Sequence, residues 1–425
     1  MEVRRLADLD EAGRTAFTER DAGIDGIRED VAGIVERVRA ERDDALRALA
    51  REVDGVEQET IEVTDVAAAR DEVDAGTMAA IERAAANIRE FHERQVPEDW
   101  REVFDGRELG RRFRPIERVG AYVPGGTAAY PSSALMTVIP AVVAGVPEVA
   151  VATPPAEEIN PATLAAIHEA GADEVYAIGG AQAVAALAYG TRTVDPVAKV
   201  VGPGNPWVTA AKAEVRGDVA IDFLAGPSEV LVLADGSADP EYVAADLVAQ
   251  AEHNPDSSVV AVTDDPDLAE AVAGAAERRA DAGDRAGMIG ESLAGAASGV
   301  LLADSMAAAA DFAEEYAPEH LSIQAADEEA LLDRIDSAGS VFLGPYTPVA
   351  AGDYASGTNH VLPTGGLARV SGGLSVDSFL RSSTVQRLDR EALAALEETI
   401  TTLARAEGLG AHAASVEERL EGRQG

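Results

Sequence analysis

The sequence predicts an α/β protein with two doubly wound, Rossmann-like parallel-sheet domains and helical extensions at both ends of the chain. From about residue 120, short apolar runs alternate with helical ones in two successive series. This alternation is typical of parallel sheets wrapped by helices. The segments on either side are charged and have helical periodicity. No G-x-G-x-x-G sequence occurs, so both expected units are incomplete and lack the standard dinucleotide-binding fingerprint.

The expected elements follow in chain order. Amphipathic periodicity predicts helices over 29–54 and 79–95. In the first series the expected strands are 148–154, 174–180 and 198–205, with helices at 161–172 and 181–191 between them. In the second series the expected strands are 229–235, 257–265, 299–305, 321–327 and 340–345, with helices at 239–253, 266–282, 306–317 and 328–339. Residues 346–366 are expected to form a long polar loop, a kind that is often functional, and 390–425 a helical tail broken at Gly408 and Gly410.

Composition excludes several classes of protein. The 425 residues carry a net charge of −41 in dispersed acidic residues, and the only lysines are Lys199 and Lys212. Such charge repels nucleic acid and anionic membranes, and we interpret it as an adaptation to a high-salt cytoplasm. The absence of cysteine excludes disulfides, a thiolate nucleophile and a cysteine zinc site. The most apolar window, 136–152, is interrupted by two prolines and a glutamate, which excludes a spanning helix there. We therefore expect a cytoplasmic protein.

The histidines are the most informative polar residues because there are only six. Two of them, His92 and His168, lie in charged helical segments and are expected at the surface. The other four lie at loop edges, each near a carboxylate or amide: His253, His320, His360 and His412. Nitrogen and oxygen donors of this kind suit Zn²⁺ without thiolate, although any one of them is more commonly a structural histidine.

One pair within this set has the spacing of a binding site. Gln250 and His253 are three residues apart near the end of an expected helix, so they share one face. Solvated capping is the ordinary explanation of such a pair, and a metal site is the alternative. Glycine-rich turns at 123–133, 179–183 and 201–206 would let a backbone approach a nucleotide, but each is a weak signal alone.

Other standard motifs are missing. The P-loop pattern and H-E-x-x-H do not occur, and the sequence around Ser228 lacks the second glycine of a nucleophile elbow. A P-loop nucleotide site, an H-E-x-x-H metalloprotease and a serine hydrolase are therefore not indicated.

Taken together, eight segments resemble the histidinol dehydrogenases, and the resemblance runs from about residue 16 to the C-terminus. The segments are ERVGAYVPGGTAAYPSSALM, GAQAVAALAYGT, VGPGNPWVTAAK, IDFLAGPSEVLVLAD, QAEHNPDS, YAPEHL, GDYASGTNHVLPT and AEGLGAHAASV. Members of this family are zinc enzymes that oxidise L-histidinol to L-histidine with two NAD⁺, the last step of histidine biosynthesis. The combination of these eight segments in this order is highly specific for the family.

The resemblance implies a role for each matching position. One Zn²⁺ per subunit would be held by Gln250, His253, Asp353 and His412. Glu319 and His320 would be the acid–base pair. The substrate would be bound by these six residues together with Ser228, His360 and Glu407. NAD would be bound at Tyr122, Gln182 and Asn205. One departure is Arg381, which stands where the family commonly has lysine, and we expect no catalytic consequence from it.

The chemistry required agrees with these positions. Hydride loss from an alcohol calls for a base with a pKa near neutrality, which suits His320. Since there is no cysteine to form a thiohemiacetal, the aldehyde must be oxidised as its hydrate, and Glu319 is the obvious group to activate water.

The resemblance also implies a domain organisation and a homodimer. Residues 1–16 would be an N-terminal arm, 17–121 with 229–374 the larger α/β domain, 122–228 the NAD-side domain, and 375–425 a tail on the partner subunit. His412 and Glu407 would then enter the partner's site in trans. Two alternatives stay open, a zinc-dependent hydrolase with the same ligands and a non-enzymatic metal-binding or ligand-binding protein.

Overall fold

The computed structural model describes residues 1–20, 22–125, 129–283 and 285–421. The chain forms two compact units, one of Met1–Gln95 with Ile116–Phe379 and one of Val96–Pro115 with Leu380–Gly425. Within the described residues, no helix combines the length and apolar character needed to cross a membrane.

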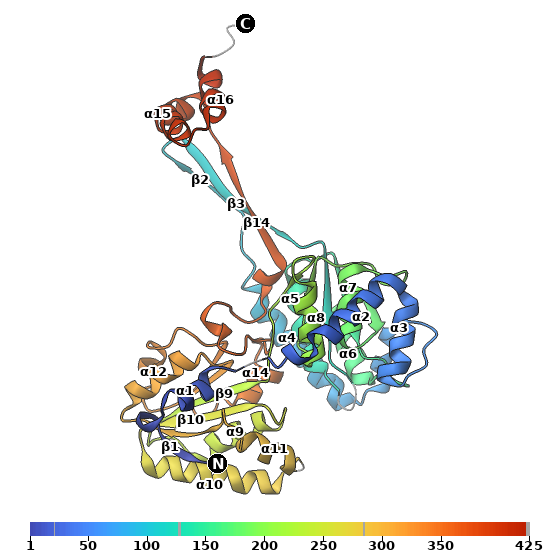
Figure 1. The fold of residues 1–425 in the computed structure, drawn as a ribbon, viewed down its shortest axis with the longest axis vertical. Helices are drawn as coiled ribbons and strands as arrows, with labels where there is room; N and C mark the ends of the chain where they lie inside the picture. Colours follow the sequence, from blue (N-terminus) through green and yellow to red (C-terminus); the bar gives the residue numbers. More distant parts are fainter. Residues whose placement is uncertain (21, 126–128, 284, 422–425) are drawn as a thin grey trace. The chain divides into compact units, whose positions relative to one another are not determined.

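Sheet 1 is a six-stranded parallel sheet in the larger unit, and its helices lie on both faces (Figure 1). In spatial order its strands are β1 (Val3–Arg5), β11 (Gly299–Leu302), β10 (Ser258–Thr263), β9 (Glu229–Ala234), β12 (His320–Gln324) and β13 (Ser340–Leu343). One face packs against α9 (Pro240–Ala251), α10 (Pro266–Ala282) and α11 (Ala286–Leu293). The other packs against α1 (Glu11–Thr18), α12 (Met306–Tyr316) and α13 (Glu328–Leu332). The central strands are buried on both faces, as expected for a covered parallel sheet.

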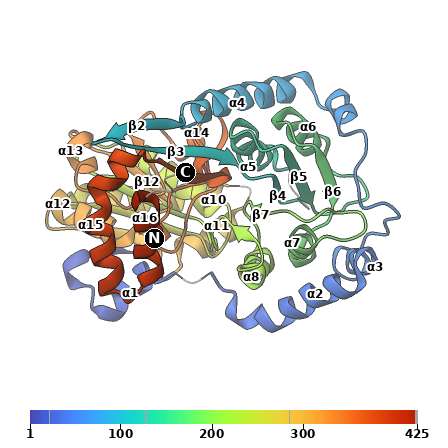
Figure 2. The ribbon, with the colours of Figure 1, turned by 90° about the horizontal axis from the view of Figure 1, so that it is seen from above.

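Sheet 2 is a five-stranded parallel sheet in the same unit. In spatial order its strands are β6 (Glu174–Ala177), β5 (Glu148–Thr153), β4 (Arg118–Tyr122), β7 (Lys199–Val201) and β8 (Ala220–Ile221). Figure 2 shows α4 (Ala75–Glu93), α5 (Pro131–Val143) and α6 (Pro161–Ala170) along one face of this sheet. Along the other lie α2 (Arg28–Glu41), α3 (Asp43–Leu49), α7 (Gly180–Tyr189) and α8 (Pro206–Val215).

The two sheets share one topology, which confirms the predicted fold class of two doubly wound parallel sheets. Without β1, we can number the five strands of sheet 1 by their order along the chain. Read across the sheet, this numbering is 3-2-1-4-5, and sheet 2 gives the same order. The strand order therefore reverses between β9 and β12 in one sheet and between β4 and β7 in the other. Such switch points are where open α/β sheets commonly bind ligands.

A short sequence pattern begins several of the helices. Asp239, Asp265, Asn160 and Asn205 each precede a proline and accept hydrogen bonds from backbone N–H groups of the helix that follows. The side-chain oxygen satisfies free N–H groups of the first turn, and proline fits the first helical position because it lacks an N–H.

The smaller unit contains an antiparallel sheet that the sequence did not predict. β14 (Leu380–Arg387), β3 (Arg107–Pro115) and β2 (Trp100–Phe104) form a ribbon, followed by α15 (Arg390–Ala406) and α16 (Gly410–Glu421) (Figure 1). These strands are largely exposed and carry charged or polar residues on both faces, so they have no apolar alternation to mark them.

Three further expectations need correction. The expected loop 346–366 contains α14 (Val349–Tyr354), which is too short to show a helical period. The helix expected over 328–339 ends at Leu332. His92 is buried, not at the surface, because it follows Ile81, Ala85 and Ile88 on the buried face of α4.

Candidate active site

The amino-terminal ends of β9 and β12 meet at the switch point of sheet 1, with His320 paired beside Val230. Glu319 Oε2 accepts hydrogen bonds from the Ser228 hydroxyl at 2.6 Å and from the Glu229 backbone N–H at 2.8 Å. His320 Nδ1 lies 2.9 Å from the Glu229 carbonyl oxygen. The backbone of Glu229 thus fixes both members of the expected acid–base pair.

The surroundings of His320 define its proton positions. A carbonyl oxygen can only accept, so Nδ1 carries a hydrogen, and in the neutral imidazole the lone pair is on Nε2. Nε2 is buried and makes no hydrogen bond among the described residues, and Asp353 Oδ1 lies 3.5 Å away from it. Burial lowers the pKa of His320, but the nearby carboxylates of Glu319 and Asp353 outweigh it and hold the pKa well above its ordinary value.

A buried ion pair between Arg20 and Glu229 holds in place the residue whose backbone contacts Glu319 and His320. Arg20 Nε lies 2.7 Å from Glu229 Oε1, and its Nη2 lies 3.1 Å from Oε2. The guanidinium carbon of Arg20 lies 3.7 Å from the centroid of the Tyr316 ring, and the Gly365 N–H donates to Glu229 Oε1 at 2.7 Å. Burial raises the pKa of Glu229, although the Arg20 guanidinium opposes this. The carboxylate of Glu229 therefore pairs with Arg20, while its backbone contacts Glu319 and His320.

Three of the four expected metal ligands lie in this unit. Gln250 is buried in the last turn of α9, and its Nε2 contacts the Ser228 hydroxyl. The helix ends at Ala251, and His253 follows in a turn whose N–H donates to the Gln250 carbonyl at 3.2 Å. Burial raises the pKa of Asp353, but the imidazoles of His320, His360 and His253 lower it below its usual value.

His360 connects the α14 segment to helix α5, which follows strand β4 of sheet 2. Its Nδ1 lies 3.0 Å from the Asp353 carbonyl oxygen, and its Nε2 lies 3.3 Å from the hydroxyl of Ser133 in α5. The neighbouring Asn359 donates to the Met136 carbonyl in the same helix at 2.7 Å. Burial lowers the pKa of His360, so its uncharged form is favoured.

Two expected NAD residues lie at or just after the carboxyl ends of strands of sheet 2. Tyr122 is the last residue of β4, and its hydroxyl accepts a hydrogen bond from the Gly180 N–H at 3.2 Å. Gln182, in the first turn of α7, is only 3% exposed and donates to Asp54 at 3.4 Å. Burial raises the pKa of Tyr122 to about 12, so it stays protonated at neutral pH.

The third expected NAD residue, Asn205, caps α8 with its side-chain oxygen, and its NH₂ group makes no hydrogen bond with a described residue. Gly202, three residues before it, has φ +112°, and a Cβ there would lie 2.2 Å from the Tyr122 carbonyl oxygen. Only glycine fits this turn. Residues 126–128 of the expected glycine-rich turn 123–133 lie outside the described residues.

Comparisons with known proteins show the family of the chain. A family model described as histidinol dehydrogenase matches residues 18–420. The chain is 68% identical to a histidinol dehydrogenase of Haloarcula marismortui, over 99% of this chain and all of the relative. A relative of the same name from Methanothermobacter thermautotrophicus is 49% identical over 99% of the chain and 98% of its own length. The crystal structure of histidinol dehydrogenase from Elizabethkingia anophelis superposes with a TM-score of 0.94 at 37% identity, covering 99% and 97% of the two chains.

The chain belongs to the histidinol dehydrogenase family. It is thus an enzyme of that family.

Two residues with roles implied by family resemblance lie in the smaller unit. His412 is exposed near the start of α16, and Glu407 is exposed at the end of α15. Their place in the site stays a prediction.

The metal site likewise stays a prediction. No cluster of three or more His, Cys, Asp or Glu side chains suited to a metal is found in the described part of the chain. Of the proposed ligands in the larger unit, only His253 and Asp353 belong to those residue types, and Gln250 supplies an amide.

Several residues of this site were not predicted from the sequence. They are Arg20, Glu229, Ser133 and Asp54. Ser133 and Glu229 do lie inside the segments that resemble the family, beside residues that were selected. Arg20 and Asp54 lie in the N-terminal helical region, where charged residues are too common to draw attention.

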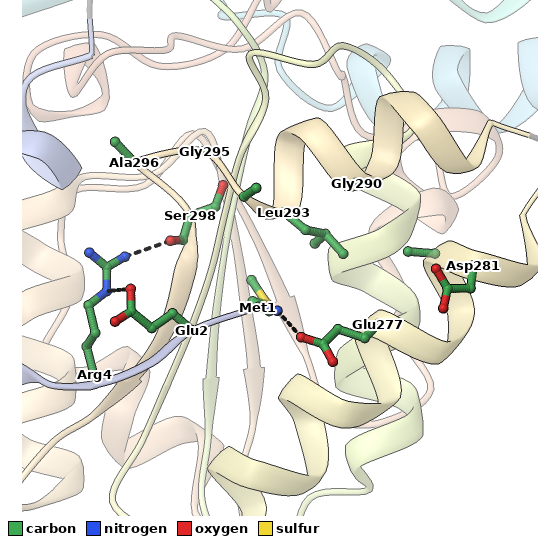
Figure 3. Close-up of a pocket in the computed structure, with 12 residues that line it drawn as sticks. Met1, Glu2, Arg4, Glu277, Asp281, Gly290, Leu293, Gly295, Ala296 and Ser298 are labelled. Carbon is green, nitrogen blue, oxygen red and sulfur yellow. Dashed lines mark hydrogen bonds and ion pairs between the residues drawn. The ribbon is translucent and has the colours of Figure 1, made fainter.

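A separate cavity of about 520 Å³ lies at the β1 edge of sheet 1 (Figure 3). Met1, Glu2 and Arg4 line one side of it, and residues of α10 and α11 line the other. Arg4 donates to the Ser298 carbonyl at 2.8 Å, and the Met1 amino group pairs with Glu277. None of the site residues named above lines this cavity.

Proposed function

We propose that this protein oxidises L-histidinol through L-histidinal to L-histidine, with two NAD⁺ as hydride acceptors and one Zn²⁺ per subunit. This would be the last step of histidine biosynthesis, carried out in the cytoplasm. The observation that carries the proposal is the pair of Glu319 and His320, both held by the backbone of Glu229 beside Asp353.

In the first oxidation, hydride passes from the alcohol carbon to NAD⁺ and the hydroxyl proton passes to a base. His320 Nε2 suits this role because its lone pair is free and Nδ1–H is anchored to a carbonyl. The pKa of His320 is held high by two carboxylates. A cation at Asp353 would offset that carboxylate and favour the neutral, basic imidazole.

In the second oxidation, water adds to the aldehyde and hydride leaves from the hydrate. Glu319 Oε2 already accepts two hydrogen bonds, whereas Oε1 accepts none from the described residues. Oε1 can therefore take the proton of the attacking water. The imidazolium of His320 formed in the first oxidation returns its proton to the aldehyde oxygen as water adds. The neutral imidazole can then receive a hydroxyl proton as the second hydride leaves, and Glu319 releases the water proton to solvent.

The donors in the larger unit fit a borderline cation. The Gln250 side chain is oriented by its Nε2 contact with Ser228, and its Oε1 makes no hydrogen bond with a described residue. The Asp353 carboxylate and the His253 imidazole interact electrostatically. Zn²⁺ would be held by these three residues and by His412, and when bound it would supply a template for the substrate's nitrogen atoms.

Substrate contacts would come from the same cluster. The Ser228 hydroxyl lies between Glu319 and Gln250, and the His360 imidazole is fixed at both nitrogens. Glu407 would complete the set from the other unit. NAD would lie at the carboxyl edge of sheet 2, against Tyr122, Gln182 and Asn205.

The smaller unit supports a homodimer with sites shared between subunits. The side chains it buries, among those described, are small: Ala392, Thr401, Ala404 and Ala413. Leu403 is 58% exposed, and Val103 is 72% exposed. Because a unit of this size needs a larger apolar core, we propose that it packs on a second copy of the chain. His412 and Glu407 would then enter the partner's site.

The acidic surface supports function at high salt. Lys212 is 2% exposed and pairs with Asp222 at 2.7 Å, and Lys199 donates to the Ser378 carbonyl at 2.7 Å. Lys212 is thus internal and Lys199 is half-buried, so the exposed positive charge is mainly arginine. Cations in molar KCl would screen the acidic repulsion.

An absorbance assay at 340 nm tests the proposal. Enzyme in molar KCl should form NADH from L-histidinol and NAD⁺, lose this activity on chelation and recover it with added Zn²⁺. A hydrolase or a simple binding protein would form no NADH. Full activity in a verified metal-free preparation would contradict the zinc proposal.

A further inference from the structure

One carboxylate near sheet 2 occupies a position where a negative charge is unfavourable. Asp54 ends the helical turn Ala50–Asp54 that continues α3, and Gly55 follows it in the left-handed conformation. A negative charge at a helix C-terminus opposes the helix dipole. Asp54 is also partly buried and forms an ion pair with no arginine or lysine among the described residues.

The pKa of Asp54 reflects this unfavourable position. Burial raises the pKa of Asp54 to about 6, and the hydrogen bond from Gln182 only partly opposes this. Asp54 is still mainly ionised at neutral pH, so the fold carries an uncompensated charge. Groups perturbed in this way are concentrated at functional sites.

Asp54 points toward two residues expected to bind NAD. Its Oδ2 accepts the long hydrogen bond, 3.4 Å, from the buried amide of Gln182. Its charge is also among the influences that raise the pKa of Tyr122, after burial. Tyr122 in turn accepts from Gly180, at the start of α7. Three polar side chains therefore converge beside the carboxyl edge of sheet 2.

The position of this cluster distinguishes the two ends of a dinucleotide. α7 covers one face of sheet 2 together with α2, α3 and α8, whereas α5 covers the other (Figure 2). The link to the acid–base region, Ser133 with His360, is on the α5 side. A dinucleotide crossing the edge with its nicotinamide toward His360 would place its adenosine end on the α7 side, near Asp54.

We propose that Asp54 accepts hydrogen bonds from the 2′- and 3′-hydroxyls of the adenosine ribose of NAD and thereby selects NAD over NADP. A carboxylate accepts from both hydroxyls of a diol, and it repels a 2′-phosphate by like charge. The residue would do the work of the acidic residue in a standard dinucleotide-binding unit, although it comes from an N-terminal helix. This inference rests on the proposed use of NAD.

The test compares two substitutions that each remove one negative charge from the same segment. Asp54→Asn keeps the shape and an acceptor for Gln182. Glu57→Gln is the control, because the Glu57 side chain is 82% exposed and its one ion pair among the described residues is with Arg51, at 3.9 Å. The measurements are kcat and KM for NAD⁺ and NADP⁺ with saturating L-histidinol, fluorescence titration with NADH and NADPH in its absence, and melting temperature.

We expect Asp54→Asn to raise KM for NAD⁺ about tenfold, the size of one lost strong hydrogen bond, with kcat within about twofold of wild type. The preference for NAD⁺ over NADP⁺ should fall at least about tenfold, and NADPH should bind more tightly than to wild type. The melting temperature should not fall, because an unfavourable buried charge has been removed. Glu57→Gln should change none of these values.

Failure of this inference can be distinguished from failure of the proposed function. If the wild type forms no NADH, the proposed function fails, and the NADH and NADPH titrations still test Asp54. An unchanged preference in Asp54→Asn, with an active wild type, would overturn the inference, as would a lower melting temperature with unchanged preference. If Asp54→Asn does not fold, Asp54→Ser, which also retains an acceptor, is held to the same criterion.

Discussion

At the scale of single residues, the division of labour between Glu319 and His320 gives the sharpest prediction. Glu319→Gln keeps acceptors for Ser228 and Glu229 but cannot take a proton from water. It should slow histidinal oxidation by about 10²-fold or more and histidinol oxidation far less. His320→Ala should impair both oxidations.

Stopped-flow assays started from histidinol and from histidinal separate the two half-reactions. Glu315→Gln, which changes an exposed carboxylate in the preceding helix, is the control and should leave both rates unchanged. Equal losses in both half-reactions for Glu319→Gln would remove the role assigned to Glu319.

The Arg20–Glu229 pair predicts a large difference between two arginine substitutions. The side chains of this pair are 7% and 2% exposed, whereas those of Arg14 and Glu315 are 42% and 43% exposed. Arg20→Ala would leave Glu229 charged and buried without its cationic partner, so the free energy of unfolding should fall by about 3–5 kcal/mol. Arg14→Ala should change it by no more than about 1 kcal/mol. Denaturant unfolding measures both, and equal effects would show that burial of the pair is unimportant.

At the scale of elements, the glycine turn after β7 shapes the carboxyl edge of sheet 2, where we expect NAD to bind. Gly202 and Gly217 have similar backbone angles, φ +112° and +121°, but a Cβ would clash with Tyr122 only at Gly202. Gly217→Ala should therefore cost about 1–2 kcal/mol of stability from backbone strain alone. Gly202→Ala should cost about 3–5 kcal/mol, because steric overlap is added. Thermal unfolding of the two variants checks this, and equal losses would contradict a steric role for Gly202.

The sequence predicted elements well where apolar residues repeat and poorly where they do not. The buried strands β9 and β10 and the helices between them follow directly from apolar runs and Asp-Pro starts. Sheet 3, formed by β2, β3 and β14, was missed because it has no buried face to impose alternation.

The same contrast applies to the site. Ser228, Glu319 and His320 stand in distinctive local sequences, so they could be selected in advance. The Arg20–Glu229 contact joins positions 209 residues apart, and no local pattern encodes it. Likewise, no pattern in the sequence indicates that the candidate site of sheet 1 lies at the amino ends of β9 and β12. The usual rule for α/β sheets would place it at the carboxyl ends.

At the scale of the whole molecule, shared sites predict complementation between two inactive variants. His253→Ala chains and His412→Ala chains, each inactive alone, are unfolded together and refolded. If His412 acts in trans, each mixed dimer has one site with both lesions and one intact site, so random pairing should recover roughly a quarter of wild-type activity. If it acts in cis, both sites of a mixed dimer stay damaged. No recovery, with mixed dimers demonstrated, would defeat the shared-site proposal.

The stoichiometry of the complete reaction tests the central claim most directly, namely that one site carries out two successive oxidations. A limiting amount of L-histidinol is converted with excess NAD⁺ in molar KCl, and NADH, histidinal and histidine are quantified at the end point. The account predicts two NADH and one histidine for each histidinol consumed, with no accumulated histidinal. One NADH per histidinol with histidinal as the product, or no NADH at all, would contradict it.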